Sequence, residues 1–396
     1  MTGAASGPLD GFRVVEIAEG VAGPAIGMQL GDAGADVIKI ETPQGDRTRA
    51  WAPAVDGRDS IPFRSLNRNK RGVVVDWAVA ADRELARDLL ADADVVIVDL
   101  PELPHADLDP KRLSEQNPRL IYLAVSGFGA QGPWAHRPAA DLPAQLSSET
   151  TASLGVTGEE PVRVGTDVGG MYAAIYGVQA VCAALWERET SGLGQRVDVS
   201  LFGSLIAMRS TLWVALSNPD EWWGFHLDSY AKPPDHGYQC ADLPIYFSLA
   251  RMDRDSMSAL LADLDMPWVR DDPLFPLLAA DTGGGTGRHA HEVHHLWERG
   301  FAKWPADQVM ATIERHGGIA FPMNDYARLV AQPQVQATGV LARIPDGNDS
   351  DEFTTISPPW EFSDTPASIR RSAPALGEHT AEIQSQLPRR EKVGPA

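Results

Sequence analysis

The sequence predicts an α/β protein whose core is an open, mostly parallel sheet with helices on both faces. Short apolar runs alternate with helical stretches through the first half of the chain, which is the pattern of buried parallel strands. A chain of 396 residues is too long for one compact core and predicts two domains. Near residue 225 the sequence becomes rich in aromatic residues and proline, which indicates a change of domain.

The first α/β unit shows the pattern most clearly. Residues 14–17 form an apolar run, a Gly/Pro turn follows at 20–24, a helix carries Ile26 and Leu30, and a second run spans 35–40. The same alternation predicts strands at 72–76, 94–98, 120–125, 162–165 and 196–200. It predicts helices at 83–92, 112–117 and 169–186.

The second half predicts a smaller α+β domain. A strand is expected at 244–249 and helices at 253–264, 289–303 and 305–316, and the chain returns to the first domain near Ala331. The expected organisation is a large domain from residues 1–225, a small domain from 226–330, and a return segment of the large domain from 331–396.

Composition and charge narrow the function. The formal net charge of −20 argues against nucleic acid or an anionic membrane as the main partner. Two cysteines, Cys182 and Cys240, indicate a reducing compartment, and the N-terminus shows no export signal. Residues 169–186 carry no formal charge over 18 positions, but without a companion span a buried core helix is the better interpretation. A cytoplasmic protein is predicted.

One motif suggests a metal. His291-Glu292-Val293-His294-His295 matches H-E-x-x-H, which on a helix can bind zinc. The sequence offers no obvious third zinc ligand in a matching context. A solvated His-rich helix explains the same segment equally simply. The Gly-rich loop at 283–288 lacks the Lys-Ser/Thr of a phosphate-binding loop. We therefore predict no metal site.

Asp167 is the candidate catalytic carboxylate. It stands between the expected strand at 162–165 and the long apolar helix, and Gly169 and Gly170 follow it. Taken locally, an aspartate there is better explained as a helix N-cap. A helix N-terminus also stabilises an anionic carboxylate, and the glycines could leave room for an acyl group.

Six segments, in order along the chain, resemble one enzyme family. They begin at residues 7, 67, 117, 183, 331 and 357 and read GPLDGFRVVEIAEGVAGPAIGMQLGDAGADVIKIETPQGDRTRAW, NRNKRGVVVDW, NPRLIYLAVSGFGAQGP, AALWERETSGLGQRVDVSL, AQPQVQATGV and SPPWEFSDTPASIRRSAPALGEHTAEI. They are similar to the family III coenzyme A transferases, which include formyl-CoA transferase, carnitine CoA-transferase and α-methylacyl-CoA racemase.

The resemblance implies a discontinuous large Rossmann-like domain, a small domain and an interlocked homodimer. It implies coenzyme A (CoA) and an acyl-CoA as substrates, a carboxylic acid as acceptor, and no tightly bound cofactor. Asp167 matches the family's nucleophile, which forms a mixed anhydride and then an aspartyl-CoA thioester. A second acidic position falls on Asp141. The racemases carry His just before it, where this chain has Ala140.

The resemblance also places the CoA site. Its implied contacts are Val21, Ala22, Thr42, Val75, Asp76, Trp77, Ala78, Ala140 and Asp141. The chain departs from the family pattern here, because basic side chains are missing at Thr42 and Ala78 and the Asn-Phe-Arg-Pro-Gly loop is replaced by a segment that begins at Asp99. Basic residues nearby (Lys39, Arg47, Arg49, Arg68, Lys70 and Arg71) could meet CoA or face solvent.

The sequence leaves three alternative hypotheses for the function. The leading hypothesis is CoA transfer from an acyl-CoA donor to a carboxylic acid. A racemase is the alternative, which Ala140 disfavours because racemisation needs an acid/base pair at the α-carbon. A repurposed paralogue with weak or no CoA binding is motivated by the missing basic contacts.

Overall fold

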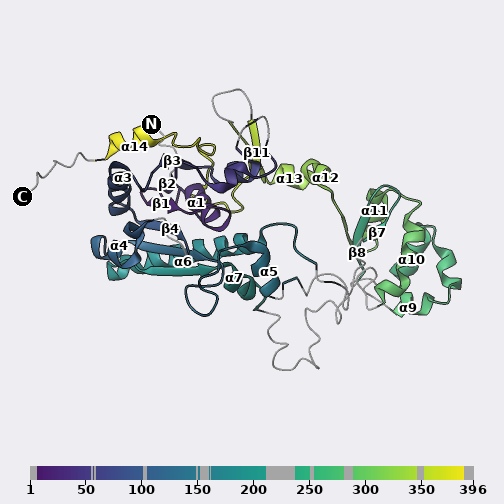
Figure 1. The fold of residues 1–396 in the computed structure, drawn as a ribbon. Coiled ribbons are helices and arrows are strands. Elements are labelled where there is room, and N and C mark those ends of the chain that lie inside the picture. The colour runs from purple at the N-terminus through teal and green to yellow at the C-terminus, as the bar shows by residue number, and fades with distance from the viewer. Residues whose placement is uncertain are drawn as a thin grey trace, which may run out of the picture. The chain divides into compact units, whose positions relative to one another are not determined.

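The computed structural model describes residues 7–54, 57, 59–100, 105–148, 150–151, 160, 162–210, 237–249, 254–280, 289–345 and 352–387. The chain forms two compact units. Unit 1 contains Met1–Arg209 and Gln336–Ala396, and unit 2 contains Ser210–Val335 (Figure 1). The aromatic segment at 222–234, the Gly-rich loop at 283–288 and residues 101–102 lie outside the described residues.

Unit 1 is built on a six-stranded sheet in the order β3-β2-β1-β4-β5-β6. Every pairing in it is parallel, which confirms the predicted fold class. The strands are β1 Arg13–Ile17, β2 Asp36–Glu41, β3 Lys70–Val74, β4 Val95–Asp99, β5 Ile121–Ser126 and β6 Arg196–Ser200. The order reverses between β1 and β4, and ligands bind at such switch points in open α/β sheets.

Apolar side chains cover both faces of this sheet. Val14 packs into one core with helices α1, α5, α6 and α7, while its neighbour Val15 packs into another with α3, α4 and α14. Successive strand residues point to opposite faces, so a strand buried on both sides needs a continuous apolar run. The helices are α1 Ala22–Asp32, α2 Ile61–Leu66, α3 Ala80–Ala91, α4 Pro110–Gln116, α5 Asp141–Ser147, α6 Val168–Ser191, α7 Leu201–Met208 and α14 Thr380–Gln386. The described part of unit 1 also contains two short 3-10 helices, η1 Arg47–Ala50 and η2 Ala106–Leu108.

The C-terminal segment packs against the edge strand β3. The Gly72 N–H donates to His379 Nδ1 at 3.2 Å, and the Val74 N–H donates to Thr380 Oγ1 at 3.2 Å. Ile383 of α14 is buried in the same core. An antiparallel hairpin, β10 Leu341–Pro345 and β11 Glu352–Ile356, precedes this segment.

Unit 2 has its own core on a small antiparallel sheet in the order β7-β8-β9. Trp297, Tyr238 and Phe247 are fully buried in that core and pack edge to face. The elements are β7 Tyr238–Gln239, β8 Pro244–Ser248, β9 Ile319–Pro322, α8 Arg254–Asp263, η5 Pro267–Asp271, α9 Phe275–Ala280, α10 Ala290–Phe301, α11 Ala306–Arg315 and α12 Tyr326–Ala331. A short helix, α13 Pro333–Ala337, follows at the unit boundary.

One strand prediction is wrong, and another has shifted bounds. Residues 162–165 form no strand, because Val164 donates its N–H to the Gln145 side chain at 3.1 Å instead of to a neighbouring strand. β3 starts at Lys70 and ends at Val74, two residues before the predicted range. Charged residues open this strand because each is paired, and Asp76 accepts the Ala78 N–H at 2.9 Å in the turn that follows.

Helix α6 is a core helix with one exposed apolar stripe. Among the described helices it alone is long and apolar enough to cross a membrane. Ala173, Val181 and Leu185 are nonetheless buried against the sheet. Its outer face exposes apolar residues one or two turns apart, with Trp186 80% exposed; the stripe consists of Met171, Ile175, Cys182 and Trp186.

Candidate active site

Asp167 lies directly before α6 with its side chain half-buried. It occupies the N-cap position of that helix, yet its carboxylate makes no capping hydrogen bond. Burial raises the pKa of the Asp167 carboxyl, and the negative charge of Asp141 raises it further. Asp167 therefore presents a carboxylate that the helix does not use.

Asp141 supplies the cap that the local sequence assigned to Asp167. It is the first residue of α5, and its Oδ1 accepts the Gly170 N–H at 2.9 Å. Its Oδ2 accepts from Gln145 Nε2 at 2.5 Å, and the same Nε2 donates to the Thr166 carbonyl at 3.2 Å. The start of α6 is thus fixed from α5, and the prediction of Asp167 as a hydrogen-bonding cap is wrong.

The two glycines after Asp167 allow close packing. A Cβ on Gly169 would lie 2.9 Å from Asp141 Oδ1, and one on Gly170 would lie 3.0 Å from Val21 Cγ1. The space that we expected to admit an acyl group is therefore filled by Asp141 and Val21. The Gly170 N–H is bonded to Asp141, whereas the Gly169 N–H has no partner in the described part of the chain.

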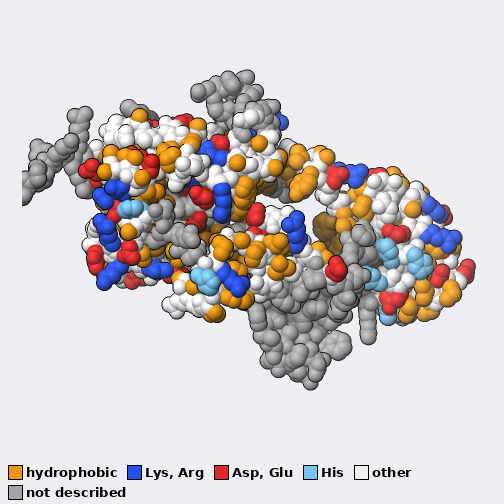
Figure 2. Space-filling view, viewed as in Figure 1, with side chains coloured by type: hydrophobic (Ala, Val, Ile, Leu, Met, Phe, Trp, Pro, Cys, Tyr) orange, Lys and Arg blue, Asp and Glu red, His pale blue; other side chains and the backbone are white. Residues whose placement is uncertain are grey.

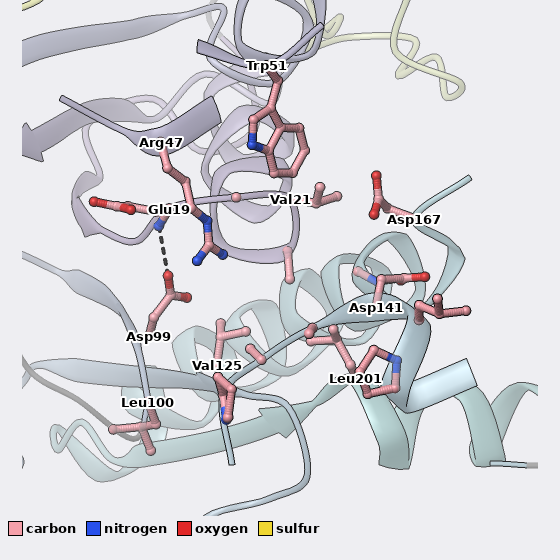
Figure 3. A pocket seen from close by; sticks show the side chains of 18 of the residues that line it. Glu19, Val21, Arg47, Trp51, Asp99, Leu100, Val125, Asp141, Asp167 and Leu201 are labelled. Atoms are coloured by element: carbon pink, nitrogen blue, oxygen red, sulfur yellow. Dashed lines mark hydrogen bonds between the residues drawn. The ribbon is translucent and has the colours of Figure 1, made fainter. Parts of the chain in front are cut away.

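A cavity of about 600 Å³ opens beside Asp167 at the carboxyl ends of the sheet strands. Figure 3 shows Asp167 and Asp141 on one side of it and Arg47, Glu19 and Asp99 on the other. Five predicted site residues line it: Val21, Ala22, Ala140, Asp141 and Asp167. The cavity joins the candidate nucleophile to the turn that follows β1.

Several lining residues were not among the predicted site residues, and those with polar or aromatic side chains include Glu19, Trp51, Asp99 and His136. Asp99 ends β4 and Glu19 follows β1, and the Glu19 N–H donates to Asp99 Oδ2 at 2.7 Å (Figure 3). The proximity of Glu19 and Asp99 could have been predicted from the sequence, because polar residues at the carboxyl ends of adjacent buried parallel strands meet at one edge of the sheet. No periodic or motif signal marks Trp51 or His136.

Of the six basic residues for which both CoA contact and a solvated surface were open, Arg47 lines the cavity. It forms no ion pair with another described residue. The other arginines are paired, with N–O distances of 2.7 Å for Arg49–Glu41, 2.6 Å for Arg68–Asp32 and 2.6 Å for Arg71–Asp36. Their charge is therefore committed to the fold. On the face drawn in Figure 2, basic and acidic side chains lie interspersed.

Lys39 and Lys70 belong to a fully buried charge cluster. Lys39 Nζ lies 3.0 Å from Glu16 Oε1 and 2.9 Å from Asp46 Oδ2, and Lys70 Nζ lies 2.7 Å from Glu16 Oε2. All four side chains are excluded from solvent. Both interpretations of these lysines, CoA contact and solvated surface, are wrong. Asp46 also caps η1 through the Thr48 N–H at 2.8 Å, so the cluster fixes the turn that carries Arg47.

Some predicted nucleotide contacts lie outside the cavity: Thr42, Val75, Asp76, Trp77 and Ala78. They follow β2 and β3, the strands beyond β1 in the sheet, so they continue the same edge away from Asp167. Trp77 stacks on His105, with ring centroids 5.6 Å apart and planes 10° apart. Val75 is fully buried and offers a ligand only its backbone.

The H-E-x-x-H segment lies on α10 of unit 2. His294 Nε2 bonds the Gly237 carbonyl oxygen at 3.0 Å, and Glu292 is paired with His289 at 3.3 Å. The described residues contain no group of three or more side chains placed to hold a metal ion. Several histidines are exposed on the face of unit 2 drawn in Figure 2, as expected for a solvated helix.

Comparison with known proteins identifies the family. A sequence model described as CoA-transferase family III matches residues 9–380. The chain belongs to CoA-transferase family III. It is 31% identical over 393 residues to the succinate–glutarate CoA-transferase of Agrobacterium fabrum, covering 96% of each chain. It is 26% identical to the formyl-CoA:oxalate CoA-transferase of Streptomyces avermitilis, covering 95% of this chain and 94% of that one.

A solved structure agrees with the family assignment. The CAIB/BAIF family protein from Brucella suis superposes with a TM-score of 0.81 at 29% identity, covering 97% of this chain and all of that one. The predicted family resemblance is confirmed. The protein is a CoA-transferase, with CoA thioesters and carboxylic acids as its substrate classes.

Proposed function

We propose that this CoA-transferase works by covalent catalysis at Asp167. The observation that carries the proposal is the division of labour at the start of α6. Asp141 accepts the Gly170 N–H, so the Asp167 carboxylate remains free to attack a ligand in the cavity. Partial burial strips water from this carboxylate, which raises both its pKa and its reactivity as a nucleophile.

The reaction consists of two exchanges that mirror each other. An Asp167 oxygen attacks the donor thioester carbon, the C–S bond breaks, and a mixed anhydride and the CoA thiolate form. The thiolate attacks Cγ of Asp167, which releases the donor acid and leaves an aspartyl-CoA thioester. The acceptor carboxylate then attacks Cγ and expels the thiolate, which takes the acceptor acyl group and frees Asp167. One thioester replaces another, and no net proton is consumed.

We propose the Gly169 N–H as the donor that stabilises the oxyanions of these steps, because it has no hydrogen-bond partner among the described residues. It belongs to the first turn of α6, where free N–H groups and the helix dipole favour negative charge. The Gly170 N–H does not take this role, because Asp141 already occupies it. Asp141 instead acts on Asp167 through its charge.

CoA is proposed to lie along the carboxyl edge of the sheet. Trp77, Thr42 and Val21 follow β3, β2 and β1, which are neighbours in that order, so these residues form a row that leads to the cavity. Trp77 supplies an aromatic face for the adenine, and Val21 with Ala22 borders the arm that carries the thioester. Arg47 supplies positive charge within the row.

We further propose a cytoplasmic homodimer. The resemblance implies interlocked chains, and the exposed stripe on α6 supplies an apolar surface for a second copy. Trp186, 80% exposed, is the largest side chain of this stripe. Trp186→Glu is expected to shift the sedimentation coefficient to that of a monomer; an unchanged dimer would place the interface elsewhere.

A screen of acyl-CoA donors against acid acceptors, read by mass spectrometry, tests the function. Succinyl, glutaryl and formyl thioesters are the first donors to try, because the relatives' names contain these acids. Wild type is expected to transfer CoA between at least one pair, and Asp167→Ala is expected to transfer none. Asp198→Ala, an exposed aspartate outside the cavity, is the matched control. Full transfer by the Asp167 variant would refute the role of Asp167.

A further inference from the structure

Asp99 has one oxygen committed to the fold and one open to a ligand. It ends β4 at the wall of the cavity. Its Oδ2 accepts the Glu19 N–H at 2.7 Å, whereas its Oδ1 has no hydrogen-bond partner among the described residues. Figure 3 shows this second oxygen turned away from Glu19. The reaction steps proposed for Asp167 do not use it.

The charges around Asp99 leave it without a dedicated counterion. Lys39 in β2 acts on it from a distance but is ion-paired with Glu16 and Asp46. Arg47 in η1 favours the anion, and Glu16 in β1 opposes it. On the Oδ1 side, a Cβ added to Gly23 of α1 would lie 3.5 Å from that oxygen. The other titratable groups on the lining of this cavity are Glu19, His136, Asp141 and Asp167. Burial outweighs the cations and raises the pKa of Asp99 to about 7.

We infer that Asp99 binds the uncharged, amide-bearing arm of the thioester carrier as a protonated acid, with Oδ1–H donating to an amide carbonyl of that arm. The inference rests on the proposed function, because it places the CoA arm in this cavity. Binding then takes up one proton: the free carboxylate, a solvent proton and the ligand combine into a neutral complex. Asp99 thereby selects a neutral hydrogen-bonding segment at this point of the cavity.

The physical reason is desolvation. The arm of CoA between its diphosphate and its sulfur carries amides and no cation. When it covers Oδ1 it removes water from an anion and supplies no compensating charge, so the neutral acid is favoured in the complex. As a carboxylic acid, Asp99 keeps the bond from the Glu19 N–H and gains one donor for the ligand.

Calorimetric titration with S-methyl-CoA tests this inference. The thioether cannot acylate Asp167, so only binding is measured. Wild type, Asp99→Asn and Glu19→Gln are compared from pH 6 to 8.5, in buffers of different ionisation enthalpy. Asn keeps the acceptor for the Glu19 N–H but cannot titrate. The ratio of the wild-type Kd to the Asp99→Asn Kd is expected to rise about 30-fold over this range, and wild type is expected to take up nearly one proton at pH 8.

The ratio removes the titration of the ligand's own phosphate, which both proteins share. Glu19→Gln is the matched control on the same wall, and it should keep the wild-type slope. A flat ratio, or a slope lost equally in Glu19→Gln, would overturn the inference while leaving CoA binding intact. Failure of wild type to bind S-methyl-CoA at pH 6 would overturn both the inference and the proposed function. If Asp99→Asn does not fold, the absence of proton uptake by wild type at pH 8 would overturn the inference alone.

Discussion

Asp167→Ala is expected to leave the free energy of unfolding of unit 1 unchanged or slightly higher at pH 7, whereas Asp141→Ala should lower it. Asp141 accepts the Gly170 N–H and the Gln145 amide, so its truncation removes a helix cap worth about 0.5–2 kcal/mol. It also leaves the buried Gln145 side chain without one partner, at about 1–3 kcal/mol. The expected loss is about 1.5–5 kcal/mol.

The sign for Asp167 follows from its raised pKa. A carboxyl that binds its proton more tightly in the folded than in the unfolded state weakens folding once it ionises, and stability falls as the pH rises through that interval. At pH 7 the alanine variant removes this cost and loses no capping hydrogen bond.

Urea unfolding followed by circular dichroism measures both free energies, and hydrogen exchange of the α6 amides localises the effect. Asp141→Asn, which keeps the Oδ1 acceptor, is the control and should lose less than Asp141→Ala. If Asp167→Ala costs as much as Asp141→Ala and speeds exchange at the start of α6, then Asp167 is a structural cap and the geometric argument fails.

Three further predictions concern pH, the buried charges and the nucleotide. Asp141→Asn should lower the pKa of Asp167, because it removes the negative charge beside that carboxyl. Asp167 acts as a carboxylate and activity falls as it gains a proton, so the acid limb of the kcat/KM profile should move to lower pH. An unmoved limb would show that Asp141 does not act on Asp167. Lys39→Met should lower the free energy of unfolding in urea by about 3–5 kcal/mol, since it leaves Asp46 buried without a cation. Arg47→Met, at an exposed position, is the control and should cost less than about 0.5 kcal/mol. Equal effects would contradict the role of the buried charge cluster in stability. Trp77→Ala should weaken CoA binding by about 1–3 kcal/mol, the range for stacking of one base, and leave pantetheine binding unchanged in competition assays; an equal loss for pantetheine would exclude stacking.

The sheet could be predicted from sequence because its strands are buried on both faces. Such strands are continuous apolar runs, as at Val14, Val15 and Ile17, and their alternation with helices leaves few arrangements. The start of β3 was missed because Lys70 and Arg71 look like surface residues. Their burial depends on Glu16 and Asp36, which lie far away in the sequence.

The candidate site was predictable only in part. The resemblance pointed to Asp167 and Asp141, and both line one cavity. Their roles at the helix were not readable, because a hydrogen bond from the Gly170 N–H to a carboxylate 29 residues earlier has no local signature. The absence of a strand at 162–165 likewise depends on the Gln145 side chain, which takes the place of a neighbouring strand.

Chemical trapping of the covalent intermediate tests the central claim most directly. The protein is incubated with an acyl-CoA that it accepts, treated with hydroxylamine or borohydride, digested and analysed by mass spectrometry. Hydroxylamine should convert Asp167 to its hydroxamate, and borohydride should reduce its carboxyl carbon to an alcohol, only when acyl-CoA is present. Modification of Asp141, Glu19 or Asp99 in its place, or transfer that proceeds without any modified carboxyl group, would contradict the account.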